Sequence, residues 1–375
     1  MYRQSVTTRL LEDGGVEVVD PDWESLPLLK AIQPDFKVRR SRLEKFLSPR
    51  LQRAKQFLLP IERKEIGDLT YEQLWAVHDT AIGAFRSWPG SGDTVGETSL
   101  LEIKIEIVRR ALEKCRLCGR NCRANRLSGQ KGVCGLGAEG LVGEMFTHIA
   151  EEPPVNPSIN VGLRGCGLGC HFCQKHDLLN VIGFGVPLKH ELWKCVQRQA
   201  RRARSLSFIG GNPDESLYSI LHFMNGVPSH FNLPVVWNSN GYGSLSVYRL
   251  LEGVVDAYMP DAKFYSPECS LSLADCANYF ETFEKGLAEV TSQGVPVFVR
   301  MLVLPGHAEC CHLPMIDFLS GYKERIKLNI MGQYYPDYLM RGNGSFPMGS
   351  RPEPSEVTSV RSYAQKYGEG WLGFP

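Results

Sequence analysis

The stretch SINVGLRGCGLGCHFCQ, residues 158–174, runs from an apolar, strand-like segment directly into a loop rich in glycine and cysteine. The first six residues predict a buried β-strand. The loop then spaces Cys166, Cys170 and Cys173 as C-x3-C-x2-C. Three thiolates are one fewer than the four ligands that normally close a zinc site or an iron–sulfur cubane. This loop is therefore a candidate metal site with one ligand position open.

The residues alone leave the metal at this loop open between two choices. A zinc ion could take His171 or His176 as its fourth ligand. The glycines at positions 165, 167 and 169 favour a cluster, because they relieve steric crowding and let the backbone wrap a bulky group.

Strand-like and helical segments alternate from residue 158 onward. The strand-like runs are 158–163, 205–211, 233–240, 254–264, 295–306 and 325–333, and helical patterns cover 187–204 and 215–224. Six such alternations predict an α/β fold in which helices cover a parallel sheet. Several runs end in polar or glycine residues, which predicts one site at the carboxyl ends of the strands.

Composition narrows the class of protein. The 375 residues include 42 basic and 41 acidic side chains, so the net charge of +1 gives no general reason to expect nucleic acid as a partner. No apolar run reaches the roughly 18 residues of a membrane span. The charged start, MYRQSVTTRLLEDGG, does not fit a signal peptide. We therefore expect no membrane partner and a cytoplasmic location, in which clustered cysteines favour metal over disulfides.

A first cysteine group precedes the strand region. Cys115, Cys118, Cys122 and Cys134 follow C-x2-C-x3-C-x11-C, which fits either a zinc ion or a second iron–sulfur cluster. The other cysteines receive simpler interpretations. Cys195, Cys269 and Cys276 are expected to be small core residues, and HAECCH (307–312) is expected to be a loop with two buried thiols.

The cysteine pattern, with Phe172 before its last cysteine, resembles the signature of the radical S-adenosylmethionine (SAM) enzymes. The resemblance implies a partial, laterally open (β/α)6 barrel of the TIM type, with a 4Fe–4S cluster on Cys166, Cys170 and Cys173. It also implies that SAM chelates the open iron. Reductive cleavage of SAM would then yield a 5′-deoxyadenosyl radical that abstracts hydrogen from a substrate. Reduced flavodoxin or ferredoxin would be the electron donor.

The resemblance also assigns SAM-binding roles. Segment 207–213 matches a Gly-Gly-Glu motif through Gly210 and Gly211, with Asn212 where an acidic residue is usual, and Phe172 would lie against the adenine.

Further positions resemble the glycyl-radical activating enzymes. Asp261 and Lys263 match their Asp-x-Lys segment, and Arg300, which interrupts an apolar run, matches an arginine that lies against SAM. Asn238 and Asn240 are candidates of the same kind. Gln333 stands where those activases have a histidine.

From about residue 115 onward, the chain most resembles proteins homologous to pyruvate formate-lyase activating enzymes. Residues 1–113 are predicted to form a helical N-terminal extension, 114–157 a cysteine-rich metal-binding segment, and 158–375 the radical SAM barrel. The substrate is open between a glycyl-radical enzyme, a peptide and a small metabolite. A non-catalytic scaffold with zinc at both cysteine groups is the alternative from a different class.

Overall fold

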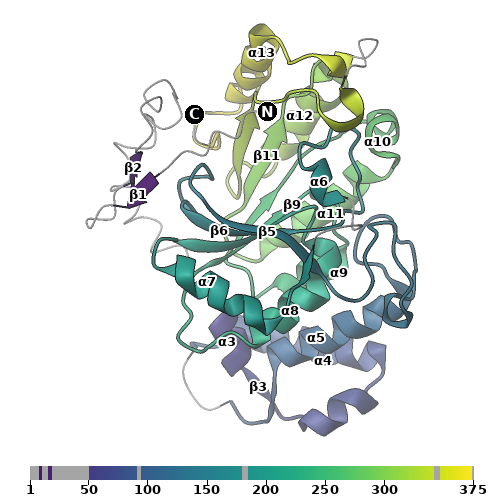
Figure 1. Ribbon diagram of the computed structural model, residues 1–375, viewed down its shortest axis with the longest axis vertical. Helices are drawn as coiled ribbons and strands as arrows, with labels where there is room; N and C mark the ends of the chain where they lie inside the picture. The colour runs from purple at the N-terminus through teal and green to yellow at the C-terminus, as the bar shows by residue number, and fades with distance from the viewer. Residues whose placement is uncertain are drawn as a thin grey trace.

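The computed structural model describes residues 8–10, 16–18, 50–90, 94–179, 185–341 and 347–373. Within these ranges the protein is a mixed α/β structure built around a central sheet of strand order β10-β9-β8-β6-β5-β7 (Figure 1). The predicted α/β class is therefore confirmed.

Parallel strands make up most of this sheet. They are β6 (Ser158–Leu163), β8 (Ser205–Gly210), β9 (Val235–Ser239) and β10 (Ala257–Pro260). Isolated bridges from Tyr258 to Val297 and from Asp261 to Arg300 continue the parallel order to β11 (Phe298–Leu302). Strand β11 in turn pairs in parallel with β12 (Lys327–Met331). Each of the six predicted strand-like runs thus contains one parallel strand.

The sheet edge next to β6 carries an antiparallel strand that the sequence did not predict. Strand β5 (Leu141–His148) pairs antiparallel with β6 and also with the two-residue strand β7 (Val186–Pro187). In the described ranges the strands form no closed ring. The structure therefore confirms a parallel-rich sheet, while a partial TIM-type barrel stays a prediction.

Helices follow the parallel strands and bury their apolar sides against the sheet. They are α6 (His176–Leu179), α7 (Trp193–Ala200), α8 (Leu217–Asn225), α9 (Leu245–Leu251), α10 (Pro267–Ala274), α11 (Tyr279–Ser292), α12 (Leu313–Ser320) and α13 (Pro354–Gln365). One large apolar cluster contains buried residues of the sheet and of most of these helices. Burial of this apolar surface is the main favourable contribution to folding.

The N-terminal part adds a further helical layer. It contains α3 (Arg50–Gln56), α4 (Tyr71–Ser87) and α5 (Leu100–Ala111), and α5 packs against α4 and α8. Capping boxes begin α4 at Thr70 and α5 at Ser99. The short strands are β1 (Thr8–Leu10), β2 (Val16–Val18), β3 (Leu58–Leu59) and β4 (Thr98–Ser99). Much of the predicted N-terminal extension, including residues 19–49, lies outside the described residues.

The connection between β5 and β6 crosses one face of the sheet. Val155 in this connection forms a separate buried cluster with Val236, Ala257, Met259 and Phe298 of β9, β10 and β11. Glu151 and Glu152 precede it in the same buried stretch. Two carboxylates are therefore held against the sheet near the ends of its strands.

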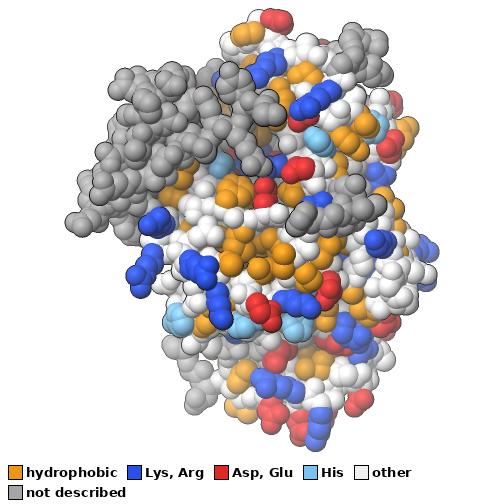
Figure 2. All heavy atoms as spheres, in the orientation of Figure 1, with side chains coloured by type: hydrophobic (Ala, Val, Ile, Leu, Met, Phe, Trp, Pro, Cys, Tyr) orange, Lys and Arg blue, Asp and Glu red, His pale blue; other side chains and the backbone are white. Residues whose placement is uncertain are grey.

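On the outer surface, basic and acidic side chains are interspersed on the face shown in Figure 2, in keeping with the net charge of +1. Among the described helices, none has the length and apolar character needed to cross a membrane.

Candidate functional site

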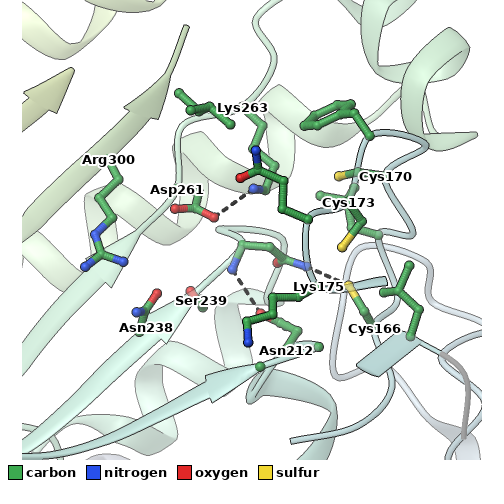
Figure 3. Close-up of a pocket in the computed structure, with 18 of the residues that line it drawn as sticks. Cys166, Cys170, Cys173, Lys175, Asn212, Asn238, Ser239, Asp261, Lys263 and Arg300 are labelled. Carbon is green, nitrogen blue, oxygen red and sulfur yellow. Dashed lines mark hydrogen bonds and ion pairs between the residues drawn. The ribbon is translucent and has the colours of Figure 1, made fainter. Parts of the chain in front are cut away.

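A cavity of about 310 Å³ lies at the carboxyl ends of the parallel strands. Its wall contains residues that directly follow β6, β8, β9, β10, β11 and β12, so every parallel strand contributes. All three cysteines of the 166–173 pattern line this cavity (Figure 3). So do the nine positions predicted to bind SAM, namely Phe172, Gly210, Gly211, Asn212, Asn238, Asn240, Asp261, Lys263 and Arg300. The structure brings these residues together, and their roles toward a cofactor stay predictions.

The cysteine loop (residues 164–174) follows β6 and is shaped by close backbone contacts. A Cβ atom at Gly211 would lie 2.2 Å from the carbonyl oxygen of Gly165, so only glycine lets the ends of β6 and β8 approach this closely. A Cβ atom at Gly167 would lie 2.7 Å from Sγ of Cys118. Gly165 and Gly167 therefore serve close packing, whereas a Cβ atom at Gly169 would meet nothing within 4 Å.

The three thiols of the cysteine loop are held as neutral groups in the absence of a cation. Burial, followed by the charge of Glu215, raises the pKa of Cys166 well above its usual range. Burial raises the pKa of Cys170 to about 12 and also raises the pKa of Cys173. A bound cation would reverse this preference, because metal ions bind the thiolate form.

Two asparagines connect Cys166 to the end of β8. The Asn240 side-chain amide donates to Sγ of Cys166 at 3.3 Å, and the Asn240 backbone N–H donates to Oδ1 of Asn212 at 2.9 Å. Asn212 in turn donates from Nδ2 to the carboxylates of Asp214 and Glu215. Both polar atoms of the Asn212 side chain are therefore hydrogen-bonded within the cavity wall. The acidic residues of this segment, Asp214 and Glu215, follow two and three positions later.

Glu215 links this wall to the cysteine loop. Its carboxylate accepts from the backbone N–H of Gly167 at 2.7 Å, and both Asp214 and Glu215 are completely buried. Burial and the neighbouring Glu215 raise the pKa of Asp214 to about 7. Burial also raises the pKa of Glu215, so burial and mutual repulsion disfavour a second negative charge on this pair.

Asp261 and Lys263 form an ion pair in the cavity wall, with Nζ of Lys263 2.7 Å from Oδ2 of Asp261 (Figure 3). Strand β10 ends at Pro260, so both side chains lie just beyond the strand rather than along it as the sequence suggested. Burial lowers the pKa of Lys263, but Asp261 and the thiol of Cys170 outweigh it, and the net shift is upward. Lys263 therefore keeps its charge.

Tyr279 of α11 fixes the backbone around this ion pair. Its hydroxyl donates to the carbonyl oxygens of Asn240 and Asp261 and accepts from the backbone N–H of Lys263 at 3.1 Å. Because one buried hydroxyl connects the segments after β9 and β10, this part of the cavity wall is preorganised.

Arg300 of β11 meets the two carboxylates of the β5–β6 connection. Its Nε donates to Glu152 at 2.7 Å, and its Nη2 donates to Glu151 and Glu152. Asn329 of β12 donates to Glu152 at 3.0 Å. Burial lowers the pKa of Arg300, whereas Glu151 and Glu152 raise it by more. The resemblance placed this arginine against SAM, and in the structure the protein itself supplies two anionic partners.

Phe172, Gln174 and Gln333 also line the cavity. The Phe172 ring is buried edge-on against Phe264 and Tyr334, with ring centroids 5.9 and 6.2 Å away. Gln333 lines the cavity and donates to Sδ of Met331. Gln174, another lining residue, has a buried Nε2 with no hydrogen-bond partner among the described residues.

The first cysteine group packs behind the cysteine loop rather than into the cavity. Cys115, Cys118 and Cys134 are buried, and Cys122 is partly exposed. Arg126 is almost completely buried and donates to Sγ of Cys115 at 3.6 Å, to Gly137 and to Glu215. The described structure brings these cysteines next to the cavity wall, and metal binding by them stays a prediction.

Arg120 joins this first cysteine group to the cysteine loop. It donates to the carbonyl oxygens of Gly167 at 2.6 Å and Leu168 at 3.0 Å, and also to those of Ala274 and Asp275 at the end of α10. Its partners are distant in sequence, so no local pattern pointed to them.

A third set of thiols was missed by the sequence analysis. Cys269, Cys310 and Cys311 lie with their sulfur atoms all within 4.8 Å of one another. Residues 308–312, expected to form a loop, form one π-helical turn instead. Only Cys311 of the 310–311 pair is buried, and Cys195 and Cys269 are partly exposed. Of the three cysteines expected to be core residues, the expectation therefore holds for Cys276 alone.

The fold and the cavity thus define an α/β protein whose strand ends surround a cysteine-lined site. The chain is 30% identical, over 317 residues, to the uncharacterized protein MJ0674 of Methanocaldococcus jannaschii, with 82% of this chain and 91% of the archaeal protein covered. The chain therefore belongs to the family of this archaeal protein. A search of family models finds no match.

Two crystal structures of Streptococcus suis SuiB are weakly similar to this protein. The form bound to S-adenosylmethionine has a TM-score of 0.38 and 14% identity, covering 56% of this chain and 47% of SuiB. Another SuiB structure has a TM-score of 0.39 and 12% identity, covering 99% of this chain and 71% of SuiB. Because both TM-scores are below 0.5, we base no conclusion on them.

Proposed function

We propose that this protein is a radical SAM enzyme that uses a 4Fe–4S cluster on Cys166, Cys170 and Cys173. The observation that carries the proposal is the shared cavity, because three thiols from one loop face polar side chains from every other strand end. When bound, the cluster supplies the electron that cleaves SAM to methionine and a 5′-deoxyadenosyl radical, which takes a hydrogen atom from the substrate.

The residues around the cavity fit such a cofactor. Three thiols leave one iron of a cubane without a protein ligand. The Nε2 of Gln174, which lacks a partner, and the charged Lys263 both provide donors for a ligand carboxylate. The cavity volume of about 310 Å³ lies at the lower end of the range for small-molecule sites.

Each cavity residue has a role that its contacts support. Asn240 donates to Cys166 and would tune the cluster through a hydrogen bond to sulfur. The Lys263 ammonium group would bind the SAM carboxylate. Asp261 would hold this lysine in place through their ion pair. The backbone carbonyl oxygens at Gly210 and Gly211 would accept hydrogen bonds from the SAM ammonium group. Phe172 would lie against the adenine.

Arg300 would act at the far wall of the cavity. Glu151 and Glu152 neutralise it, so it offers a fixed guanidinium face rather than a free cation. This arrangement would position SAM or substrate by shape and hydrogen bonding, and it would exclude a second strong anion.

The substrate belongs to the same proposal at a finer level. We infer hydrogen abstraction from a protein, a peptide or a small molecule. If the substrate is a protein, the reaction could be the activation of a glycyl-radical enzyme. Reduced flavodoxin or ferredoxin would supply the electron. The exposed face of the helical N-terminal layer would serve recognition.

The proposal is tested with anaerobically reconstituted protein, dithionite and SAM. We expect release of 5′-deoxyadenosine by the native chain and none by the Cys166/Cys170/Cys173→Ala variant. Cys195→Ala, a partly exposed cysteine on α7, is the matched control and should leave release unchanged. Equal release from the native chain and the triple variant would falsify the proposal. Zinc without iron or sulfide in the anaerobic protein would favour the scaffold alternative.

A further inference from the structure

We propose that Cys269, Cys310 and Cys311 form a third metal site, which binds a single soft divalent ion such as Zn²⁺. This site lies outside the two cysteine groups recognised in the sequence. It does not depend on the proposed SAM chemistry, because no residue of the cavity wall is one of its ligands.

The spacing of the three sulfur atoms fits one ion rather than a cluster. All three lie within 4.8 Å of one another, and the sulfurs of Cys269 and Cys310 are 3.4 Å apart. Tetrahedral geometry with Zn–S bonds of about 2.3 Å places two sulfur ligands about 3.8 Å apart. Three thiols bound to separate irons of a cubane must lie farther apart, because each iron has its own terminal ligand.

The local backbone converges to build this arrangement. Cys269 lies in the first turn of α10, where its backbone N–H donates to the N-cap hydroxyl of Ser266 at 3.1 Å. Cys310 and Cys311 lie in the π-helical turn Ala308–His312, directly before α12. Such turns are rare and are often found at functional sites. Here the turn presents two neighbouring cysteines to the same point.

Burial raises the pKa of Cys310 to about 11 and also raises the pKa of Cys311, so the charge of a bound ion must itself favour the thiolate form. Backbone N–H groups of Ser266 and Tyr265 donate to the sulfur of Cys311 and oppose the effect of burial, which raises its pKa. The N-terminus of α10, with its partial positive charge, also begins beside Cys269. Amide donors of this kind commonly support metal-bound thiolates.

Access to the site differs among the three thiols. Cys311 is buried, whereas Cys269 and Cys310 are partly exposed. An ion can therefore enter from solvent, and a water molecule can take the fourth ligand position. On binding, each thiol releases one proton to solvent, and the ion's double positive charge offsets two of the three thiolates.

The site would join two parts of the cavity wall. Cys269 follows the segment that carries Asp261 and Lys263, and Cys310 and Cys311 follow β11, which carries Arg300. A bound ion would cross-link the segments after β10 and β11 and thereby hold these charged groups at a fixed separation. The ion's role is to cross-link these segments, although three protein ligands and one water leave the site open.

Metal stoichiometry of the full-length chain tests this proposal. Reduced protein is titrated anaerobically with Co²⁺, and sulfur-to-cobalt charge-transfer absorption is recorded. The same titration is done on Cys269→Ser/Cys310→Ser/Cys311→Ser and on the control Cys195→Ser. We expect the triple variant to bind one equivalent fewer than the native chain, and the control to bind the same number. Equal stoichiometry in the triple variant and the native chain would overturn the proposal.

A second measurement keeps the test valid if the triple variant does not fold. In the native chain, Zn²⁺ should slow iodoacetamide alkylation of Cys269 and Cys310 but not that of Cys195, as read by peptide mass. The single variant Cys310→Ser should remove the protection of Cys269. Unprotected Cys269 with Zn²⁺ present, or a stable Cys269–Cys310 disulfide that excludes the ion, would also overturn the proposal. Neither readout uses SAM cleavage.

Discussion

The two cysteine groups found in the sequence lie side by side but face different surroundings. Cys166, Cys170 and Cys173 line an open cavity, whereas Cys115, Cys118 and Cys134 are buried behind it and are held by arginines. A group that faces a cavity can receive a ligand at a vacant position, and a group enclosed by protein cannot. The position of a thiol in the fold, rather than its spacing in sequence, therefore decides whether it can reach a ligand in the cavity.

The largest expected effect comes from exchanging one cysteine in each group. Cys170→Ser should lower 5′-deoxyadenosine release by more than about 100-fold, since a lost ligand exceeds the roughly 10–100-fold effect of altering a supporting residue. Cys134→Ser should lower the thermal midpoint and leave release detectable. Activity assays and melting curves on both variants check this contrast. The reverse pattern would mean that the enclosed group is the reactive one.

A second test concerns the buried ion pairs that close the cavity. Arg300→Met removes the guanidinium that pairs with both Glu151 and Glu152, and an uncompensated buried charge costs about 3–5 kcal/mol. We expect that loss in the free energy of unfolding from urea titration. Glu281→Gln is the control, because its pair with Lys285 is exposed and should change stability by less than about 1 kcal/mol. Similar losses in the two variants would contradict the burial argument.

The N-terminal helical layer contains a buried lysine that, unlike Arg300, has a lowered pKa. Lys104 is completely buried with Nζ 2.9 Å from Nε2 of His78, and burial lowers its pKa to about 7. The unfolded chain therefore binds one more proton between pH 7 and 10, and stability should rise with pH across this window by about 1.4 kcal/mol per unit. We expect urea titrations to give a free energy of unfolding about 2–3 kcal/mol larger at pH 9 than at pH 7. Lys104→Met should abolish that gain, and an unchanged gain in this variant would assign it to another group.

The smallest expected effect tests the contact between the two cysteine groups directly. In Gly167→Ala, the added Cβ would lie 2.6 Å from Glu215 and 2.7 Å from Sγ of Cys118. Overpacking of this kind costs about 1–3 kcal/mol. Gly137→Ala, in the first group, meets nothing within 4 Å and should cost far less. Melting temperatures of the two variants measure this difference. Equal melting temperatures would show that the residues around Gly167 shift to accommodate the added methyl group.

Much of the fold and of the cavity could be predicted, for a physical reason. Apolar runs report buried strands, and parallel strands bring their carboxyl ends together, so polar residues such as Asp261 that follow such runs meet at one site. Strand β5 gave no such signal, because most of its side chains are only partly buried.

The missed features depend on contacts between distant residues. Glu152 meets Arg300 across 148 positions, and Cys269 meets Cys310 across 41. No periodic pattern reports such pairs. The π-helical turn that carries Cys310 is likewise decided by tertiary packing rather than by the local composition of HAECCH.

Arg120 has a consequence for how the molecule responds to metal loss. Its guanidinium group ties the first cysteine group to carbonyl oxygens of both the cysteine loop and α10. Were the first cysteine group to hold an ion, its loss would free the backbone around this arginine, and the four carbonyl contacts would loosen together. Amide hydrogen exchange near residues 167–168 and 274–275 would then report whether the first cysteine group is filled.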